Sequence, residues 1–579
     1  MANDSGRSSG GILFAGVAVA VTAFVVVTTL IVIRNAYTSL PFEDSWFEWR
    51  RYLSFGNYFS FFFSEHNEHR IAVPRLFFLV DRFVFHARNV FPLICSLLFQ
   101  FGTCVWLYKI GRRTGHFNLV SRVLLACAII TALFSAQQFP NLVEGFQIQF
   151  TVLYFLVSGA ILAMLCAAEH LAPNRLLTRT TGEARAAQQE IPSLDREGAV
   201  WFAISAMCAL AASYSSANGL LCWPLLLALA IWLRMPGKYR LALAVGLVVV
   251  TVLYMWGYTT PPRHSRPLEE LTHNFPGVLI RAATFLGSVT EGIYAALSSA
   301  LGLSATSRIV VAATFGFAGM ALTVWAAILL WRKRDRFTNG HAGSVLIAVF
   351  VVLTAGMVGM GRGFLPVTSA LDARYKSHSL VFWIALGAFY WRMLQPRIPG
   401  LLFNAGVAAL IVSFIPIQRY WLPYSKQVGA TYREIESAIG ADVFDAPVWR
   451  KSFPFAPGES AIIGPVDYLR QNHLSLFTEA WTGWTGQPLN ALFAIDRSRS
   501  CQVSIDSMTS VDTQIKPGWR VSGHTSQPGT VILTDPAGRI AGVVRNSDGA
   551  SWNGYVAGAE RRTLKPYVLE PDGHSICGQ

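Results

Sequence analysis

The chain has 579 residues, of which 53% are hydrophobic and 14% charged, and its formal net charge is +14. Its mean hydropathy is +0.41, and it contains many apolar segments of about 20 residues, the length that crosses a bilayer. A basic chain can bind nucleic acid, but these Lys and Arg residues cluster at the ends of apolar segments, the pattern that sets membrane orientation. We therefore expect a polytopic membrane protein whose partner is the lipid bilayer and not nucleic acid.

The apolar segments predict about eleven transmembrane helices with the amino terminus in the cytoplasm. The first, "GILFAGVAVAVTAFVVVTTLIVI", is preceded by a polar start with one Arg and no cleavage site, so we interpret it as a retained span. Short basic connections such as "YKIGRRTGHF" and "WRKRDRF" indicate the cytoplasmic side. The predicted spans lie near residues 11–33, 90–108, 119–136, 146–167, 199–214, 217–233, 240–257, 308–331, 343–360, 377–394 and 400–418.

One apolar segment, "PGVLIRAATFLGSVTEGIYAALSSALGLS", does not fit this alternation. If it crossed the membrane, the basic "WRKRDRF" connection would lie outside. It also contains Arg281 and Glu291, which are costly to expose to lipid. We predict a re-entrant or interfacial helix pair on the outer side; the alternative is an ordinary span with a snorkelling Arg.

The composition changes after Tyr424, which divides the chain into a membrane domain, residues 1–424, and an extracytoplasmic region, residues 425–579. "SKQVGATYREIESAIG" predicts an amphipathic helix with Ser425 as its cap and Gly440 as its end. From about Ala491 onward, short apolar runs alternate with Gly- and Asp-rich turns. In "TVILTDPAGRIAGVV" two such runs flank a predicted type I turn. These patterns indicate a small β-sandwich of jelly-roll type.

Cysteine placement agrees with this division. Six of the eight cysteines lie in apolar spans, where a lone thiol behaves as a small hydrophobic group. The remaining two, Cys501 and Cys577, bracket the β-rich region and should form a disulfide in an oxidising compartment. No zinc-type spacing and no nucleotide-binding signature appears in the sequence, which argues against soluble nucleotide chemistry.

The first outward loop, residues 35–89, is unusually rich in ionisable side chains. It contains "PFEDSWFEWRRYLSF" and "SEHNEHRIAVPRL", in which acids, Arg and His alternate with aromatic residues. Aromatic residues at this spacing are typical of helices that lie in the headgroup layer, where they would hold the acids level with a lipid headgroup. The alternative is an amphipathic interfacial element whose charges only solvate its polar face.

Together these features resemble the GT-C superfamily of integral-membrane glycosyltransferases. The resemblance rests on the acidic pair Glu43 and Asp44 directly after the first span, the number of spans and the outward β-sandwich. "NLVEGFQIQF", "SYSSANGLLCWP" and "GRGFLPVTSALDARY" also resemble parts of bacterial membrane proteins of this type. The resemblance covers most of the chain in architecture but few residues in motif. It implies a polyprenyl-phosphate-linked sugar donor, a loop acid that acts as catalytic base or metal ligand, and a sandwich that binds carbohydrate.

From this resemblance we expect an inverting glycosyltransferase in a bacterial-type cytoplasmic (inner) membrane, with a cell-envelope glycan or glycolipid acceptor on the outer face. A carboxylate suits the task of accepting the acceptor proton, and Asp44 is the first candidate with Glu43 as the alternative. Cationic donors must stabilise the leaving phosphate. The candidates for this role are Arg374, Arg362, Arg70 and Arg75, followed by His66 and His69. If a divalent metal takes part, Glu43, Asp44, Glu68, His66 and His69 are the expected ligands, although their spacing matches no standard site.

Further candidates each have a simpler explanation. Glu144, near Gln147 and Gln149, is an ionisable group at the outer leaflet, but it could also cap the next helix. Tyr375 could bind a phosphate or serve as an interfacial anchor. Trp481 and Trp484 could stack on a sugar or pack in the domain core. Glu68 and Glu291 complete the set of candidates.

Two other classes of function remain open: a transporter or flippase for a lipid-linked sugar, and a non-catalytic protein of envelope assembly. A transporter usually has internal repeats with paired broken helices near the midplane. We find no such repeat, and the ionisable residues gather on the outer side instead of along a path through the bundle. A purely structural protein gives no reason for acids and arginines to converge there.

Overall fold

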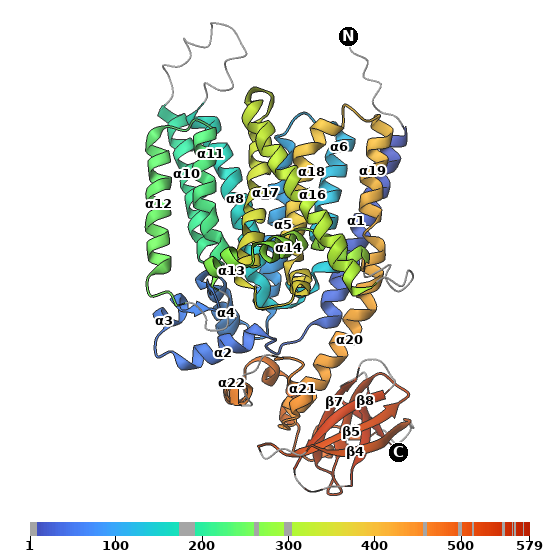
Figure 1. Cartoon of the computed structure of the whole chain (residues 1–579). Helices are drawn as coiled ribbons and strands as arrows, with labels where there is room; N and C mark the ends of the chain where they lie inside the picture. The colour runs from blue at the N-terminus through green and yellow to red at the C-terminus, as the bar shows by residue number, and fades with distance from the viewer. Residues whose placement is uncertain are drawn as a thin grey trace.

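The computed structural model describes residues 9–172, 192–259, 266–294, 304–454, 460–495, 501–511, 515–546, 551–558, 560, 563–570 and 573–578. A bundle of long helices forms the upper part of the molecule in Figure 1, and the strands lie below the lower end of this bundle. The described chain begins with α1 (Ser9–Ala36) at the bundle end that faces away from the strands (Figure 1). The bundle helices are α1 (Ser9–Ala36), α5 (Val90–Arg112), α6 (Leu119–Leu133), α8 (Ile148–Leu171), α10 (Pro192–Ser213), α11 (Cys222–Trp232), α12 (Gly237–Met255), α16 (Ala305–Arg332), α17 (Asn339–Gly361), α18 (Lys376–Leu394) and α19 (Gly400–Val412).

Eight helical segments of the described chain are long and apolar enough to cross a membrane. They are Gly10–Ala36, Val90–Arg112, Leu119–Val143, Gly145–Leu171, Gly237–Met255, Thr306–Arg332, Asn339–Gly361 and Gly400–Gly440. Each of the eleven predicted spans falls on a bundle helix. However, α10, α11 and α18 do not meet both the length and the apolar composition required of a membrane-crossing helix. α11, for example, has only 11 residues. Sequence and structure thus agree on a multi-pass membrane protein.

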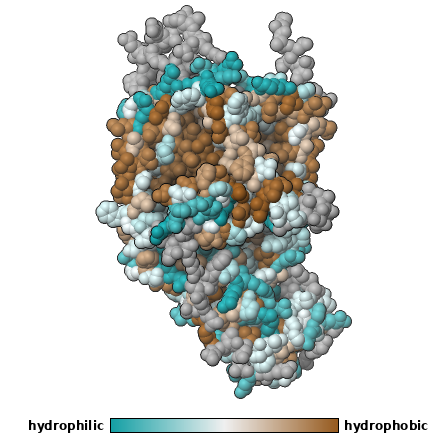
Figure 2. Space-filling view, viewed as in Figure 1, coloured by the Kyte–Doolittle hydropathy of each residue, from teal (hydrophilic) through white to brown (hydrophobic). Residues whose placement is uncertain are grey.

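The outer surface of the bundle is apolar. Figure 2 shows a brown, hydrophobic belt around the helices, with hydrophilic residues at the top rim and over the strand-bearing end. Large apolar side chains of the bundle helices are exposed, among them Leu241 and Val248 of α12 and Trp331 of α16. Such a continuous apolar surface is stable against lipid but not against water.

The segment with Arg281 and Glu291 does not form a long helix in its described part. α14 (Phe275–Leu286) has 12 residues, about 18 Å at 1.5 Å per residue, which is too short for a hydrocarbon core of about 30 Å. The Arg281 guanidinium donates to Glu270 on α13 (Pro267–His273) at 3.1 Å and to the Gly363 carbonyl at 2.7 Å. This arrangement favours the re-entrant or interfacial interpretation; residues 295–303 lie outside the described chain.

The first outward loop folds into short elements at the strand-bearing end of the bundle (Figure 1). They are α2 (Asp44–Ser54), α3 (Tyr58–Phe63), the hairpin strands β1 (Glu65–His66) and β2 (His69–Arg70), and α4 (Ala72–Val84). The hairpin pairs His66 with His69, and Asn67 at its tip has a φ of 50°, which Asn tolerates better than most residues. The loop is therefore helical with a hairpin inserted, and the hairpin was not predicted.

A continuous helix, α20 (Ile415–Gly440), links the bundle to the carboxy-terminal region (Figure 1). The prediction that Ser425 caps a separate helix is wrong, because the helix has already begun at Ile415 and Ser425 Oγ donates to the Leu422 carbonyl inside it. Gly440 ends the helix as predicted. A β-carbon at Gly440 would lie 2.6 Å from the Trp481 ring, so only glycine allows this close approach.

The carboxy-terminal strands form two sheets. The first has the order β3-β10-β9-β6-β7 and the second β4-β5-β8. The strands are β3 (Ala494–Ile495), β4 (Val503–Val511), β5 (Gly518–Thr525), β6 (Gly529–Thr534), β7 (Ile540–Asn546), β8 (Ser551–Ala557), β9 (Lys565–Leu569) and β10 (Ser575–Gly578). Short helices precede them: α21 (Ala446–Trp449), α22 (Ser460–Gln471) and α23 (Leu489–Leu492).

Side chains from both sheets share one hydrophobic cluster, which includes Val521 and Trp552 from one sheet and Val531 from the other. The predicted turn joins β6 to β7: the Gly538 N–H donates to the Asp535 carbonyl at 3.0 Å, and Gly538 has a φ of +74°. Glycine adopts this left-handed conformation without steric cost.

Cys501 and Cys577 form a disulfide, with their Cα atoms 5.6 Å apart. The bond joins the segment just before β4 to the last strand, β10, and both residues are buried in the shared cluster. The two cysteines are 76 residues apart in sequence, so the bond removes a large loop-closure entropy from the unfolded chain.

We expect loss of this disulfide to destabilise the carboxy-terminal region by about 4–5 kcal/mol in the chain-entropy treatment. Replacing Cys501 and Cys577 by Ser in the full chain should lower the denaturant concentration at which this region unfolds. Limited proteolysis at increasing denaturant concentration measures that midpoint. The matched control is Cys95→Ser, which changes a cysteine that is free in the structure. Mass spectrometry of the non-reduced wild-type protein that found both thiols free would contradict the pairing.

Candidate functional site

A cavity of about 330 Å³ lies between the first outward loop and the ends of several bundle helices. Its volume is at the lower end of the range of roughly 300–1,000 Å³ for small-molecule pockets. The lining residues are Asp44, His66, Asn67, Glu68, His69, Gln147, Gln149, Phe150, Ser216, Ala217, Asn218, Tyr258, Pro267, Thr354, Met357, Val358, Met360, Gly361, Arg362, Arg374, Tyr375 and His378. Eight residues predicted as site candidates, from Asp44 to Tyr375, therefore meet in one cavity.

The acidic pair lies at the start of α2, and its two members face different surroundings. Asp44 lines the cavity, whereas Glu43 is outside the lining and its carboxylate lies 3.8 Å from Arg374 Nη2. Glu43 has φ 42° and ψ −113°, a conformation that is strained for a residue with a side chain. The Glu43 N–H donates to the Ser452 carbonyl at 2.7 Å. A contact with the carboxy-terminal region therefore helps to hold the start of α2.

Asp44 lies beside a buried charge network formed by His66, Glu48 and Arg75. His66 Nδ1 lies 2.6 Å from Glu48 Oε1, and its Nε2 lies 4.0 Å from Asp44 Oδ2. Glu48 also accepts two hydrogen bonds from Arg75, at 2.7 and 3.1 Å. Because Glu48 and Arg75 are 6% and 0% exposed, their charges depend on this bidentate pairing.

The network also fixes the charge states of its members. Burial alone would lower the pKa of His66, but Asp44 and Glu48 raise it to about 9, so the ring is cationic at neutral pH. Burial would raise the pKa of Asp44, yet His66, Arg374 and Arg362 bring it below its usual value. Glu43 behaves oppositely, since burial raises its pKa despite Arg374.

Two arginines from the connection after α17 contribute positive charge to the cavity. Arg362 donates to Glu68 Oε1 at 2.7 Å. Arg374 lies in the 3₁₀ turn Ala373–Tyr375, donates from Nε to Asp372 at 2.9 Å and keeps its Nη2 near Glu43. Each guanidinium has five N–H donors, so these contacts leave donors for a ligand. Tyr375 follows Arg374 and also lines the cavity.

Arg70 and Arg75 do not line the cavity, so the structure does not support them as phosphate ligands. Arg70 donates to the carbonyl oxygens of Phe63, Tyr254 and Trp256. Besides its bonds to Glu48, Arg75 donates to three backbone carbonyls of the loop at 2.7–3.0 Å. Both side chains thus hold the loop in shape. Their sequence context did not distinguish them from Arg362 and Arg374.

Glu291 also lies outside the cavity, where it forms an ion pair with Arg308 of α16. Glu144 is buried next to the site and accepts a hydrogen bond from Gln147 Nε2 at 3.2 Å. Burial and the charge of Glu43 raise the pKa of Glu144 to about 8. It makes no cap hydrogen bond to the following helix.

Trp481 and Trp484 of the carboxy-terminal region pack against protein groups, which was the simpler of their two explanations. Trp481 is 8% exposed and its Nε1 donates to Glu479 at 2.9 Å. Trp484 packs edge-on against Phe493, with ring centroids 4.9 Å apart. Both therefore contribute to packing.

The acids and histidines of the site do not form a preformed metal centre. Among the described residues, the one group of three such side chains with converging ligand atoms is Cys501, Glu570 and Cys577, and its two thiols are joined in the disulfide. Glu43, Asp44 and Glu68 instead pair with His or Arg. The carboxylate oxygens of these acids therefore face His or Arg and do not converge on a common point in this structure.

Sequence reasoning missed several lining residues. His378 and Thr354 lie in apolar bundle helices, and Asn218 lies in the 3₁₀ turn Ala217–Leu221 before α11. The polar clusters "SYSSANG" and "YKSHS" were the available signal, because polar groups at such depth need partners.

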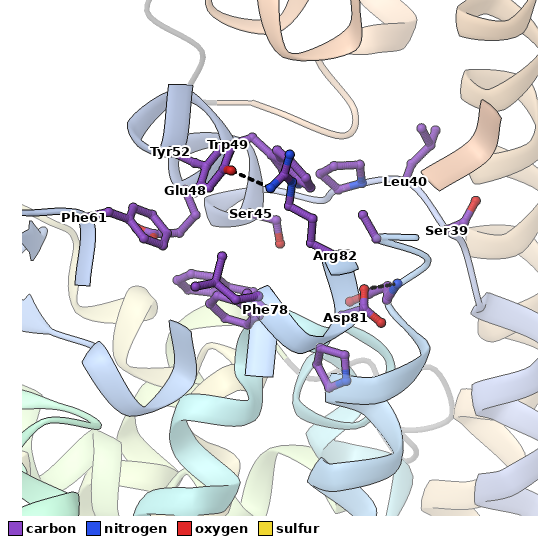
Figure 3. Close-up of a pocket in the computed structure, with 16 residues that line it drawn as sticks. Ser39, Leu40, Ser45, Glu48, Trp49, Tyr52, Phe61, Phe78, Asp81 and Arg82 are labelled. Atoms are coloured by element: carbon purple, nitrogen blue, oxygen red, sulfur yellow. Dashed lines mark hydrogen bonds between the residues drawn. The ribbon is translucent and has the colours of Figure 1, made fainter. Parts of the chain in front are cut away.

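A second cavity, of about 70 Å³, lies between α2 and α4 (Figure 3). Aromatic side chains dominate its wall, including Trp49, Tyr52 and Phe78, and Arg82 reaches across to Tyr52 (Figure 3). Glu48 borders this cavity, while its partner His66 borders the larger one. The buried network therefore forms part of the wall between them.

No family model matches this chain, and no curated protein or solved structure matches it either.

The charge on His66 predicts a pH-dependent stability. Its pKa is about 9 in the folded protein and about 6.5 in an unfolded chain. The resulting stabilisation, on the order of 3 kcal/mol, is complete below pH 6.5 and is lost as the pH rises through 9. In thermal unfolding between pH 6 and 10 (roughly), the midpoint of the wild type should therefore fall more steeply than that of His66→Gln.

Glu144 titrates in both proteins, so its contribution cancels in this comparison. His116→Gln is a suitable control because His116 is exposed in the connection between α5 and α6. Parallel pH profiles for the wild type and His66→Gln would show that His66 is not held as a cation.

Proposed function

We propose that the protein is a membrane glycosyltransferase that moves a sugar from a polyprenyl-phosphate donor to a cell-envelope glycan or lipid. One observation carries the proposal: a carboxylate, Asp44, and two arginines, Arg362 and Arg374, line the same cavity at the end of a membrane-spanning bundle. A donor phosphate needs cations, and an acceptor hydroxyl needs a base. The resemblance to the GT-C superfamily points to the same chemistry.

In the proposed reaction, the acceptor hydroxyl gives its proton to the Asp44 carboxylate and its oxygen attacks the anomeric carbon. The bond between this carbon and the phosphate oxygen breaks, and polyprenyl phosphate leaves with the electron pair. Attack opposite the leaving group inverts the anomeric centre. Arg362 and Arg374 stabilise the charge that develops on the phosphate.

The surroundings of Asp44 suit a base of this kind. His66 and the arginines keep the pKa of Asp44 low, so the carboxylate is ionised at neutral pH. A low pKa also makes it a weak base, which suffices if proton transfer accompanies attack on an already loosened sugar–phosphate bond. Glu43 has the higher pKa, but it lies outside the cavity lining, so we keep it as the alternative.

The proposal includes about eleven spans, with α10, α11 and α18 crossing the membrane beside the eight longer helical segments. It places the amino terminus in the cytoplasm of a bacterial-type cell and the cavity at the outer face of the cytoplasmic membrane. Basic residues at the ends of α5 and α16, Arg112 and Arg332, support this orientation. We further propose that the two sheets form a jelly-roll-like sandwich that binds carbohydrate.

The alternatives make different demands on the structure. A transporter would pass its substrate through the bundle, but the charged lining residues of the cavity come from the outer loop and the connection after α17. A non-catalytic assembly protein would have no use for an ionised carboxylate facing two arginines across a cavity. The enzyme is therefore the function we favour.

Binding of undecaprenyl phosphate tests the cationic part of the site. Arg374→Lys keeps the charge but loses the planar fork, so affinity should fall roughly tenfold, and Arg374→Ala should lose more. Native mass spectrometry of the purified protein measures this binding. Arg392→Lys, at the opposite end of α18, should leave it unchanged. Equal affinities in the wild type and both Arg374 variants would remove the phosphate site from this cavity.

Asp44→Asn keeps the size of the side chain and removes its charge. We expect it to slow the release of polyprenyl phosphate from sugar-bearing donors by about 10²–10⁴-fold, the usual contribution of a general base. Binding of the bare phosphate should persist, and Glu43→Gln should have the smaller effect. Turnover near the wild-type rate in both variants would mean that the base lies elsewhere, and Glu144 would be tested next.

The orientation can be tested with fusions to the whole chain. Alkaline phosphatase fused after Gln579 should be active, because it folds only outside the cytoplasm, and a fluorescent protein fused there should stay dark. A fluorescent protein at the amino terminus should be bright. The reverse pattern would place the cavity on the cytoplasmic face.

A further inference from the structure

Three carboxamide side chains form a distinct part of the cavity wall. Gln147, Gln149 and Asn218 all line the cavity, and they are only 2%, 5% and 6% exposed. The carbonyl oxygens of all three have no hydrogen-bond partner among the described residues. A buried acceptor without a partner costs free energy, so three of them around one cavity indicate a ligand that supplies donors.

The orientation of Asn218 follows from its neighbour. Thr354 Oγ1 donates to the Phe350 carbonyl at 2.9 Å, which uses the single proton of the hydroxyl. Thr354 can therefore only accept from Asn218, whose Nδ2 lies 3.2 Å away. The amide nitrogen is thus held against α17, and its oxygen is the end that remains for a ligand.

Gln147 pairs with the buried Glu144. Its Nε2 donates to Glu144 at 3.2 Å, and its Oε1 has no partner. Gln149 lies two residues further on, in the first turn of α8. Two amides from the start of α8 and one from the turn before α11 therefore lie in the wall of the same cavity, each with a buried oxygen that has no partner among the described residues.

These acceptors call for a ligand with several neutral donors. An ammonium group could also donate, but it would need an acid of its own, and the carboxylates in the lining, Asp44 and Glu68, already face His66 and Arg362. Hydroxyl groups donate without adding positive charge. A molecule that joins a hydroxyl-bearing group to a phosphate would place its hydroxyl groups at the amides and its phosphate at the arginines.

We infer that Gln147, Gln149 and Asn218 form a subsite for the ring hydroxyls of the donor sugar. The inference rests on the proposed function, because it assumes that the phosphate of the same molecule meets the arginines. The cavity of about 330 Å³ is large enough for one sugar ring and its phosphate, while a polyprenyl chain would have to lie outside it. The subsite thus recognises the sugar, and the arginines recognise the phosphate that every donor carries.

Binding of two kinds of lipid separates the subsite from the phosphate site. The probes are bare undecaprenyl phosphate and undecaprenyl phosphates that carry a hexose, a pentose or an N-acetylhexosamine, each measured by native mass spectrometry. At least one sugar-bearing lipid should bind the wild type more tightly than the bare phosphate. Asn218→Leu and Gln149→Met each remove one acceptor at similar volume, and each should weaken that lipid roughly tenfold.

Neither variant should change the affinity for bare undecaprenyl phosphate, which also shows that the variant is folded. Gln427→Met, at an exposed amide on α20, should leave both affinities unchanged. The subsite is refuted if no sugar-bearing lipid binds more tightly than the bare phosphate, or if the variants weaken both lipids equally. Failure of the wild type to bind even bare undecaprenyl phosphate would instead refute the proposed function.

Discussion

The fully buried ion pair between Arg75 and Glu48 is the interaction on which the site depends. Removing two charges from water is costly, and their bidentate contact at 2.7 and 3.1 Å offsets that cost only while the surrounding loop keeps its shape. The loop does so because Arg75 also binds three of its carbonyl oxygens. The same Glu48 fixes His66, and His66 faces Asp44. The position of Asp44 thus depends, through His66, on a pair that lies outside the lining of the larger cavity.

The carboxy-terminal region contributes to the same arrangement from the other side. Its Ser452 carbonyl holds the strained backbone of Glu43. Glu436 of α20 accepts hydrogen bonds from Thr38, just before the loop, at 2.8 Å and from Arg545 of β7 at 3.2 Å. Strain at Glu43 persists because contacts on both sides over-determine it. The strands are therefore tied to the loop that carries the acids, and the division at residue 424 is not a flexible boundary.

The membrane helices were predictable because a span of about 20 apolar residues is a property of local composition. The meeting of Asp44 with Arg374 followed from placing both on the outer side. The different roles of Arg70 and Arg75 were not predictable. These two arginines occur in polar and aromatic contexts similar to those of Arg362 and Arg374, and only the backbone carbonyls around them separate their roles. Asn218 and His378 were missed because a single polar residue in an apolar stretch is identified as a site only when its neighbours are known. The Ser425 cap failed because Pro423, despite its missing N–H, lies within a helix that continues through it.

The cavity lies where three bundle helices begin after 3₁₀ turns. α8 follows a 3₁₀ turn, α11 follows another, and α18 follows a third that carries Arg374. Where a helix breaks, backbone and side-chain polar groups lose their regular partners and must find others or face a cavity. Three such helix starts around one cavity concentrate these groups, so the amides and Arg374 gather at the end of a bundle that is otherwise apolar. The first outward loop then closes this space with Asp44 and the hairpin, so the acid comes from one part of the chain and the cations from another. Under the proposed function, one substrate contacts the acid of the loop through a hydroxyl group and the arginines of the bundle through its phosphate.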